Sequence, residues 1–151
     1  MRIFSFSKLL ILLLLASCNS AQIKKQVCCS QDAPKAIGPY SQAIKAGNFL
    51  FMSGQIGIEP GINEITGRTI SEQTEQVILN MKAVLKSAGT DISNVVKTTV
   101  FLKNISDFKE MNSIYEKHFS VNPPARSTVE VSKLPKDALV EIESIAVIPD
   151  R

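Results

Sequence analysis

Arg126 has the sequence context most suggestive of chemistry in this chain. It stands in "NPPARSTVEV", between the pair Pro123-Pro124 and an alternating, strand-like pattern. Proline fixes φ and has no N–H, so the entry to the predicted strand is stiff. Arginine is permanently charged, and its planar fork of donors matches a carboxylate or a phosphate. The residues alone leave two readings open: a surface arginine paired with a nearby acid, or an anchor for an anionic ligand.

Two carboxylates and one phenol are further candidates. Glu141 and Glu143 lie in "VEIESIAV", where a period of two places both on one face of a strand. Glutamates on strands usually face water, whereas a carboxylate in a cleft can move protons. Tyr40 follows Gly38-Pro39, which holds it in a stiff turn. It is either a core aromatic with a solvated hydroxyl or a group at a site.

Several classes of site are disfavoured by the composition. His118 is the single histidine, so a Ser-His-Asp triad or a histidine metal centre has no partners, and we expect a structural role for it near a helix end. The glycines lack a phosphate-binding spacing. A net charge of +3, two tyrosines and no tryptophan do not favour a nucleic-acid partner. We expect neither metal nor cofactor. The remaining candidates are Tyr40, Ser53, Asn112, Arg126, Thr128, Glu141 and Glu143.

Hydrophobic periodicity predicts the elements that must position these groups. The first expected element is a strand hairpin, 40–46 and 49–56, around the turn Gly47-Asn48. A helix follows, opened by a Thr69/Glu72 capping box and stopped at Gly89. Then come a strand at 95–104, a second helix opened by Asp107 and Glu110, and strands 125–134 and 139–148 joined by a turn at 135–137. This order predicts an α+β domain with two helices on one face of a mixed sheet. The other face needs a cover, which indicates self-association.

The N-terminal segment has the pattern of a targeting signal. Arg2 and Lys8 flank an apolar run that ends in Ala16-Ser17-Cys18. An ordinary secretory signal would also fit, but the order of small residues before a cysteine resembles a bacterial lipobox. We therefore expect a signal peptide at 1–17, a lipidated tether at 18–31 beginning with Cys18, and a domain at 32–151. The protein would then be anchored in the bacterial cell envelope by lipid alone. Cys28 and Cys29 in the tether receive no catalytic role.

Five stretches together resemble a known family. "AIGPYSQA", "FMSGQIGI", "VVKTTVFLKN", "PPARSTVEV" and "LPKDALVEIESIAV" stand in order across roughly residues 33–148. They resemble the Rid family of YjgF-type imine and enamine deaminases. The resemblance implies a chorismate-mutase-like α+β fold and a homotrimer whose clefts lie between subunits. It also implies a cofactor-independent hydrolysis of 2-imino acids to 2-keto acids and ammonia.

The resemblance further assigns roles to individual residues. Arg126 would grip the substrate carboxylate, Glu141 would position or activate the hydrolytic water, and the Tyr40 hydroxyl would point into the cleft. Ser53, Gly54 and Asn112 would line the site. Thr128 stands where many bacterial members have a cysteine. Two alternatives stay open: a non-catalytic, lipid-anchored trimer whose clefts bind small carboxylates, and a structural or chaperone-like protein with vestigial clefts.

Overall fold

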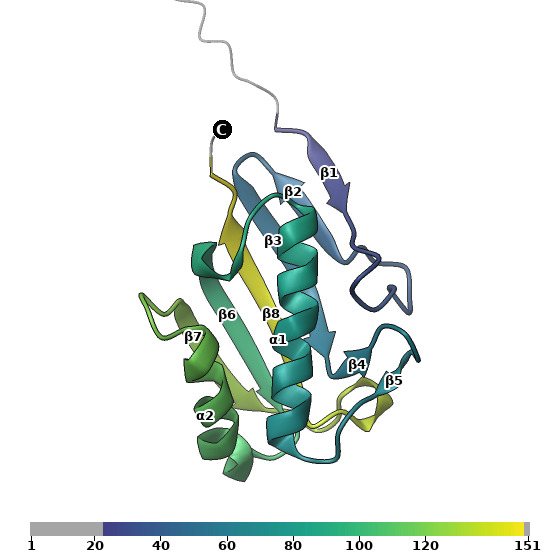
Figure 1. The fold of residues 1–151 in the computed structure, drawn as a ribbon, viewed down its shortest axis with the longest axis vertical. Coiled ribbons are helices and arrows are strands. Elements are labelled where there is room, and N and C mark those ends of the chain that lie inside the picture. Colours follow the sequence, from purple (N-terminus) through teal and green to yellow (C-terminus); the bar gives the residue numbers. More distant parts are fainter. Residues whose placement is uncertain (1–22, 150–151) are drawn as a thin grey trace, which may run out of the picture.

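The computed structural model describes residues 23–149, which form one mixed sheet covered on one face by two helices (Figure 1). The strand order is β1-β2-β3-β8-β6-β7. The strands are β1 (Lys25–Cys28), β2 (Ala43–Ala46), β3 (Phe49–Ile56), β6 (Val95–Leu102), β7 (Ala125–Glu130) and β8 (Val140–Val147). The helices are α1 (Ile70–Ser87) and α2 (Phe108–His118). The predicted fold class, α+β with two helices on one face, is confirmed.

The connections follow from the way the strands pair. β6 and β7 are parallel, and every other neighbouring pair of this sheet is antiparallel. A parallel pair needs a crossover, and α2 lies within that crossover. A small second sheet, β4 (Ile58–Glu59) with β5 (Glu64–Ile65), lies in the loop before α1. The sequence did not predict this small sheet, because each strand is only two residues long.

The hairpin and the first helix begin and end as the sequence predicts. Gly47 adopts a φ of 58°, and Ala46 pairs with Phe49 across the two-residue turn. At the start of α1, the Thr69 hydroxyl accepts the Glu72 N–H at 3.2 Å. The Glu72 carboxylate accepts the Thr69 N–H at 3.0 Å, which completes the capping box. Gly89, at a φ of 81°, follows the helix end.

The second helix begins differently from the prediction. Asp107 makes no side-chain cap, because its own φ and ψ of −79° and −2° are already helical. A 3-10 turn over Ile105–Asp107 leads into α2, and Asn104 caps that turn by accepting the Ser106 N–H at 3.0 Å. The capping role of Asp107 was therefore wrong, and the cap lies three residues earlier.

The stretch interpreted as a tether contains a strand. Lys25–Cys28 forms β1 at the sheet edge, antiparallel to β2, and Cys28 is buried in the core while Cys29 is exposed. Gln42 holds the following loop, accepting the Ser30 N–H at 2.6 Å and donating to the Pro34 carbonyl at 2.7 Å. A polar composition did not reveal this strand, because an edge strand with one buried side chain carries little apolar signal.

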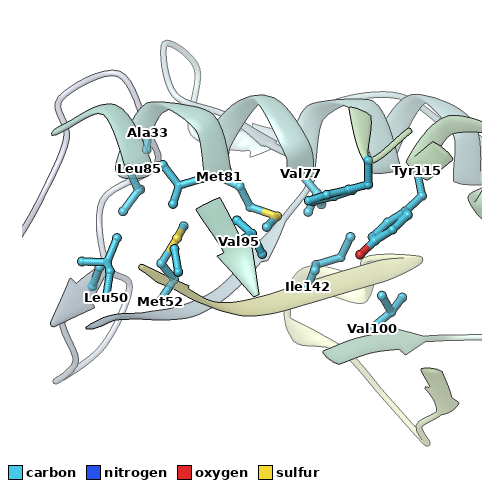
Figure 2. Close-up of a cluster of buried hydrophobic side chains, with 14 of the residues drawn as sticks. Ala33, Leu50, Met52, Val77, Met81, Leu85, Val95, Val100, Tyr115 and Ile142 are labelled. Atoms are coloured by element: carbon cyan, nitrogen blue, oxygen red, sulfur yellow. The ribbon is translucent and has the colours of Figure 1, made fainter. Parts of the chain in front are cut away.

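The core lies between α1 and the sheet (Figure 2). The inward stripe of α1 packs on side chains from β3, β6 and β8; these core residues include Val77, Met81, Leu85, Leu50, Met52, Val100 and Ile142. Across residues 23–149, no helix combines the length and apolar character needed to cross a membrane.

The opposite face of the sheet carries exposed apolar side chains. Phe49 and Phe51 on β3 are 48% and 46% exposed, and Val129 on β7 is 45% exposed. Large exposed side chains of this kind on one face usually mark an interaction surface. Self-association over this face stays a prediction.

Candidate active site

Glu141 lies at a cavity on the open face of the sheet. Its neighbours in β8, Val140 and Ile142, are fully buried beneath the helices, so alternation turns Glu141 to the other side. The cavity has a volume of about 430 Å³. We call it the Glu141 pocket; it is lined by Pro34, Lys35, Ile37, Tyr40, Ser53, Gly54, Gln55, Ile56, Ile58, Pro135 and Glu141.

An irregularity in β3 makes room for the Glu141 carboxylate. The register between β3 and β8 shifts between Met52 and Gln55, at the position of Ser53 and Gly54. A Cβ on Gly54 would lie 2.7 Å from the carboxyl carbon of Glu141, so the Glu141 carboxylate can lie here only because residue 54 has no side chain. The Ser53 hydroxyl donates to the Ser41 carbonyl at 2.7 Å, which ties the bulge to the loop that carries Tyr40.

The electrostatic surroundings of Glu141 suit proton transfer. Burial raises the pKa of the Glu141 carboxyl, and the neighbouring carboxylate of Glu143 raises it further. Within residues 23–149 the Glu141 carboxylate makes no hydrogen bond and no ion pair. A half-buried carboxyl with a raised pKa and unused oxygens is a candidate general acid or base.

Tyr40 shares this pocket, whereas Glu143 does not. The Tyr40 hydroxyl accepts the Ile37 N–H at 3.2 Å, and the residue is 47% exposed. It lies in a loop ahead of β2, so it is not a core aromatic. Glu143 is exposed and lies outside the Glu141 pocket. Glu143 acts on this site only through its charge, which raises the pKa of the Glu141 carboxyl.

Arg126 lies on the other face of the sheet, against α2. Its guanidinium carbon is 4.6 Å from the ring centroid of Tyr115 and 5.6 Å from that of Phe108. In the part of the chain that the structure describes, no carboxylate pairs with Arg126. The reading of Arg126 as half of a surface ion pair thus has no partner within one subunit. A partly buried cation without a counter-ion is suited to binding an anion.

A second cavity surrounds Arg126. Its volume is about 410 Å³, and we call it the Arg126 pocket; it is lined by Asn112, Tyr115, Glu116, Phe119, Pro123, Pro124 and Arg126. Thr128 lies two residues further along β7, so it shares the Arg126 face. Its hydroxyl is buried and makes no hydrogen bond, a property that no other buried side-chain polar atom of residues 23–149 shares.

The predicted residues therefore fall into two groups in one subunit. Tyr40, Ser53, Gly54 and Glu141 meet at the Glu141 pocket, and Asn112 and Arg126 meet at the Arg126 pocket. The sheet lies between the two groups, because Glu141 and Arg126 face opposite sides of it. The sequence analysis did not predict the contribution of Phe108 and Tyr115. An aromatic pair at a spacing of seven residues on one helix gave no signal of contact with Arg126.

His118 lies outside both pockets. Its Nε2 is 3.0 Å from the Glu75 carboxylate, and its Nδ1 is 2.9 Å from the Lys82 ammonium. These contacts join α2 to α1, in agreement with a structural role. Across residues 23–149, no group of three or more histidine, cysteine, aspartate or glutamate side chains is arranged to hold a metal ion.

Comparison with known proteins identifies the family. The family model described as "Endoribonuclease L-PSP" matches residues 30–148. The chain belongs to this family, the Rid family. It is 55% identical to the RutC family protein PH0854 of Pyrococcus horikoshii over 122 residues, which is 81% of this chain and 97% of that one. It is 47% identical over 132 residues to the chloroplastic Reactive Intermediate Deaminase A of Arabidopsis thaliana, covering 87% and 71% of the two chains.

A solved structure of the family agrees with the fold. The crystal structure of E. coli TdcF with bound serine is 38% identical, covers 81% of this chain and 98% of its own, and has a TM-score of 0.77. This Rid chain therefore has the fold of a solved relative.

The prediction of a lipid-anchored protein of the bacterial envelope was wrong. The relatives of this Rid chain include archaeal proteins and a chloroplastic protein, and none of those is described as an envelope lipoprotein. Cys18 and the apolar run before it lie outside the described residues. The pattern consists of two cations, a short apolar run and one cysteine, and so few positions are weak evidence for a lipid anchor.

Proposed function

We propose that this Rid protein hydrolyses 2-imino acids to 2-keto acids and ammonia. The observation that carries the proposal is the Glu141 carboxyl, half-buried with a raised pKa and no hydrogen bond within the described residues, beside a cavity of about 430 Å³. The cofactor-free chemistry needs only a positioned electrophile, a water and one group that moves a proton. A relative named Reactive Intermediate Deaminase A supports this reaction class.

The reaction balances without an additional reactant. With the imine protonated on nitrogen, Glu141 takes a proton from the water as its oxygen bonds to the imine carbon and the C=N π electrons pass to nitrogen, which gives a neutral carbinolamine. The same carboxyl then returns the proton to nitrogen. The C–N bond breaks as the carbinolamine hydroxyl gives its proton to the Glu141 carboxylate, the keto acid forms, and ammonia takes that proton and leaves as ammonium. Burial and the Glu143 carboxylate raise the pKa of the Glu141 carboxyl, which makes it easier for this group to hold and return the proton.

Arg126 supplies the second half of the proposed site. A 2-imino acid is flat and carries a carboxylate next to the reacting carbon, and the guanidinium fork fixes both its position and its plane. Asn112 lies beside Arg126 in the same pocket and offers a further hydrogen bond. The serine bound in TdcF also carries a carboxylate next to a carbon bonded to nitrogen, which supports this class of ligand.

The two halves need a second copy of the chain. Arg126 and Glu141 face opposite sides of one sheet, so a single subunit cannot place both on one small substrate. We propose a homotrimer in which the Arg126 pocket of one subunit meets the Glu141 pocket of the next. The exposed Phe49 and Phe51 provide apolar surface for such an assembly.

The test is a turnover assay with 2-imino acids generated in situ. The protein should release keto acid and ammonia faster than the spontaneous rate. Glu141→Gln should lower kcat about 100- to 10,000-fold, the usual contribution of a general acid or base, while pyruvate still binds. Arg68→Ala, at an exposed arginine outside both pockets, is the matched control and should keep full activity.

Two results would contradict the proposal. A rate equal to that of spontaneous hydrolysis would show that the protein does not catalyse this reaction. Pyruvate binding without turnover would instead support a carboxylate-binding module. A monomer by light scattering at micromolar concentration would remove the shared site, since we expect about three times the chain mass.

A further inference from the structure

Arg126 rests on an aromatic surface built by α2, which we call the aromatic seat and define as Phe108 and Tyr115. Both rings lie under the guanidinium, with centroids 5.6 Å and 4.6 Å from its central carbon. The two residues are seven positions apart on α2, which is two helical turns, so they lie on one face. A cation within about 6 Å of a ring face is attracted by the ring quadrupole.

The nearer ring is itself held rigidly. The Tyr115 hydroxyl and the Thr98 hydroxyl form a buried hydrogen bond of 2.8 Å. Tyr115 also stacks on Phe119, with centroids 4.3 Å apart and planes tilted by 27°. Figure 2 shows the Tyr115 ring descending from the helix with its oxygen directed toward the sheet. The Tyr115 ring is therefore held by a hydrogen bond at its hydroxyl and by stacking on Phe119, and a ring held in this way can orient the guanidinium of Arg126.

Among the described residues, the polar neighbour of the guanidinium is the Tyr115 hydroxyl, on the residue whose ring also lies against it. Residues 23–149 give it no ion pair, and the pocket around it contains Asn112 and the stiff pair Pro123-Pro124. A cation that rests on rings is oriented in its plane while its N–H donors stay available. A carboxylate partner within the subunit would have oriented it equally well but would have occupied those donors.

We propose that Phe108 and Tyr115 are positioning residues that orient the Arg126 guanidinium for the carboxylate of the substrate. This inference rests on the proposed function and adds the means by which affinity for the carboxylate is set. The seat lowers the cost of binding, because the arginine loses less side-chain freedom when the ligand arrives. The Tyr115 hydroxyl has a second task, since its hydrogen bond to Thr98 ties the ring to β6.

Substitutions at Tyr115 separate the ring from the hydroxyl. Tyr115→Phe keeps the ring face and removes the bond to Thr98, so it should lower thermal stability and weaken pyruvate binding clearly less than Tyr115→Leu does. Tyr115→Leu removes the ring and should weaken pyruvate binding about 2- to 30-fold, the range of a cation–π contact. Phe108→Leu should act in the same direction but less, because that ring is farther from Arg126. For 2-imino acids, the loss should appear in KM more than in kcat.

A spectroscopic measurement tests the geometry without a substrate. In the folded protein, ring currents should shift the Nε–Hε NMR signal of Arg126 upfield, and Arg126→Lys assigns it by removal. Few signals compete, because the other arginines are Arg2, Arg68 and Arg151. We expect the shift to persist in Tyr115→Phe and to be largely lost in Tyr115→Leu.

The outcomes separate this inference from the proposed function. An Arg126 signal that is the same in wild type and Tyr115→Leu overturns the aromatic seat, as does pyruvate affinity that Tyr115→Phe and Tyr115→Leu change equally. A wild type that shows the shifted signal but neither binds pyruvate nor exceeds spontaneous hydrolysis overturns the proposed function instead.

Discussion

The Glu141 pocket and the Arg126 pocket hold their charged groups in opposite ways. Glu141 projects from a central strand into a gap that a glycine and a bulge in β3 leave open, so backbone shape positions it. Arg126 projects from the edge strand β7 and lies on two rings of α2, so side chains position it. Glu141 is placed where burial raises the pKa of its carboxyl, whereas Arg126 is placed where the N–H donors of its guanidinium stay available. The two pockets show that a group that transfers a proton needs surroundings that shift its pKa, whereas a group that binds an anion needs its donors held in a fixed direction.

After the loss of the Glu141 carboxyl itself, the largest expected effect is the loss of the Arg126 charge. Arg126→Ala should lower kcat/KM about 30- to 1000-fold, because a charged hydrogen-bonding partner contributes roughly 2–4 kcal/mol to binding the transition state. Arg126→Lys keeps the charge without the fork and should restore only part of the loss. Steady-state kinetics on 2-imino acids, with light scattering to verify the assembly, measure both. Equal activity of Arg126→Ala and wild type would show that the substrate carboxylate is bound elsewhere.

A smaller effect is expected when the backbone support of Glu141 is altered. Gly54→Ala places a methyl group against the Glu141 carboxylate, which must move. A displacement of about 1 Å should lower kcat about 10- to 100-fold while pyruvate still binds to Arg126. Gly61→Ala is the matched control, because a Cβ at Gly61 meets no heavy atom within 4 Å and should change nothing. Unchanged kcat in Gly54→Ala would mean that the position of Glu141 does not limit the reaction.

The smallest effect should come from the neighbouring charge. Burial and the Glu143 carboxylate both raise the pKa of Glu141, so the acidic limb of the kcat/KM profile should lie above the usual range of a glutamate. The reaction needs the ionised base, so activity falls as pH drops through this pKa. Glu143→Gln removes the like charge and should move the limb to lower pH. If the acidic limb moved to higher pH or did not move, a group other than Glu141 would be responsible for it.

Much of the fold was predictable from local pattern. The Gly47-Asn48 turn, the Thr69/Glu72 capping box and the apolar stripe of α1 act through residues close in sequence, and the structure has all three. The elements that were missed have weak local signals: β1 has one buried side chain, and β4 and β5 are two residues each. The Asp107 cap was wrong because a turn upstream, not the side chain, begins α2.

The sequence by itself determined the fold class, the family and the identity of the groups that can do chemistry, because residue types and short spacings carry that information. Only the tertiary structure decided how those groups are distributed. Strand register places Glu141 and Arg126 on opposite faces. The register shift in β3 brings Gly54 against the Glu141 carboxylate. The packing of α2 on β7 turns Phe108 and Tyr115 toward Arg126. These are contacts between residues far apart along the chain, and periodicity cannot reveal them because it compares only near neighbours.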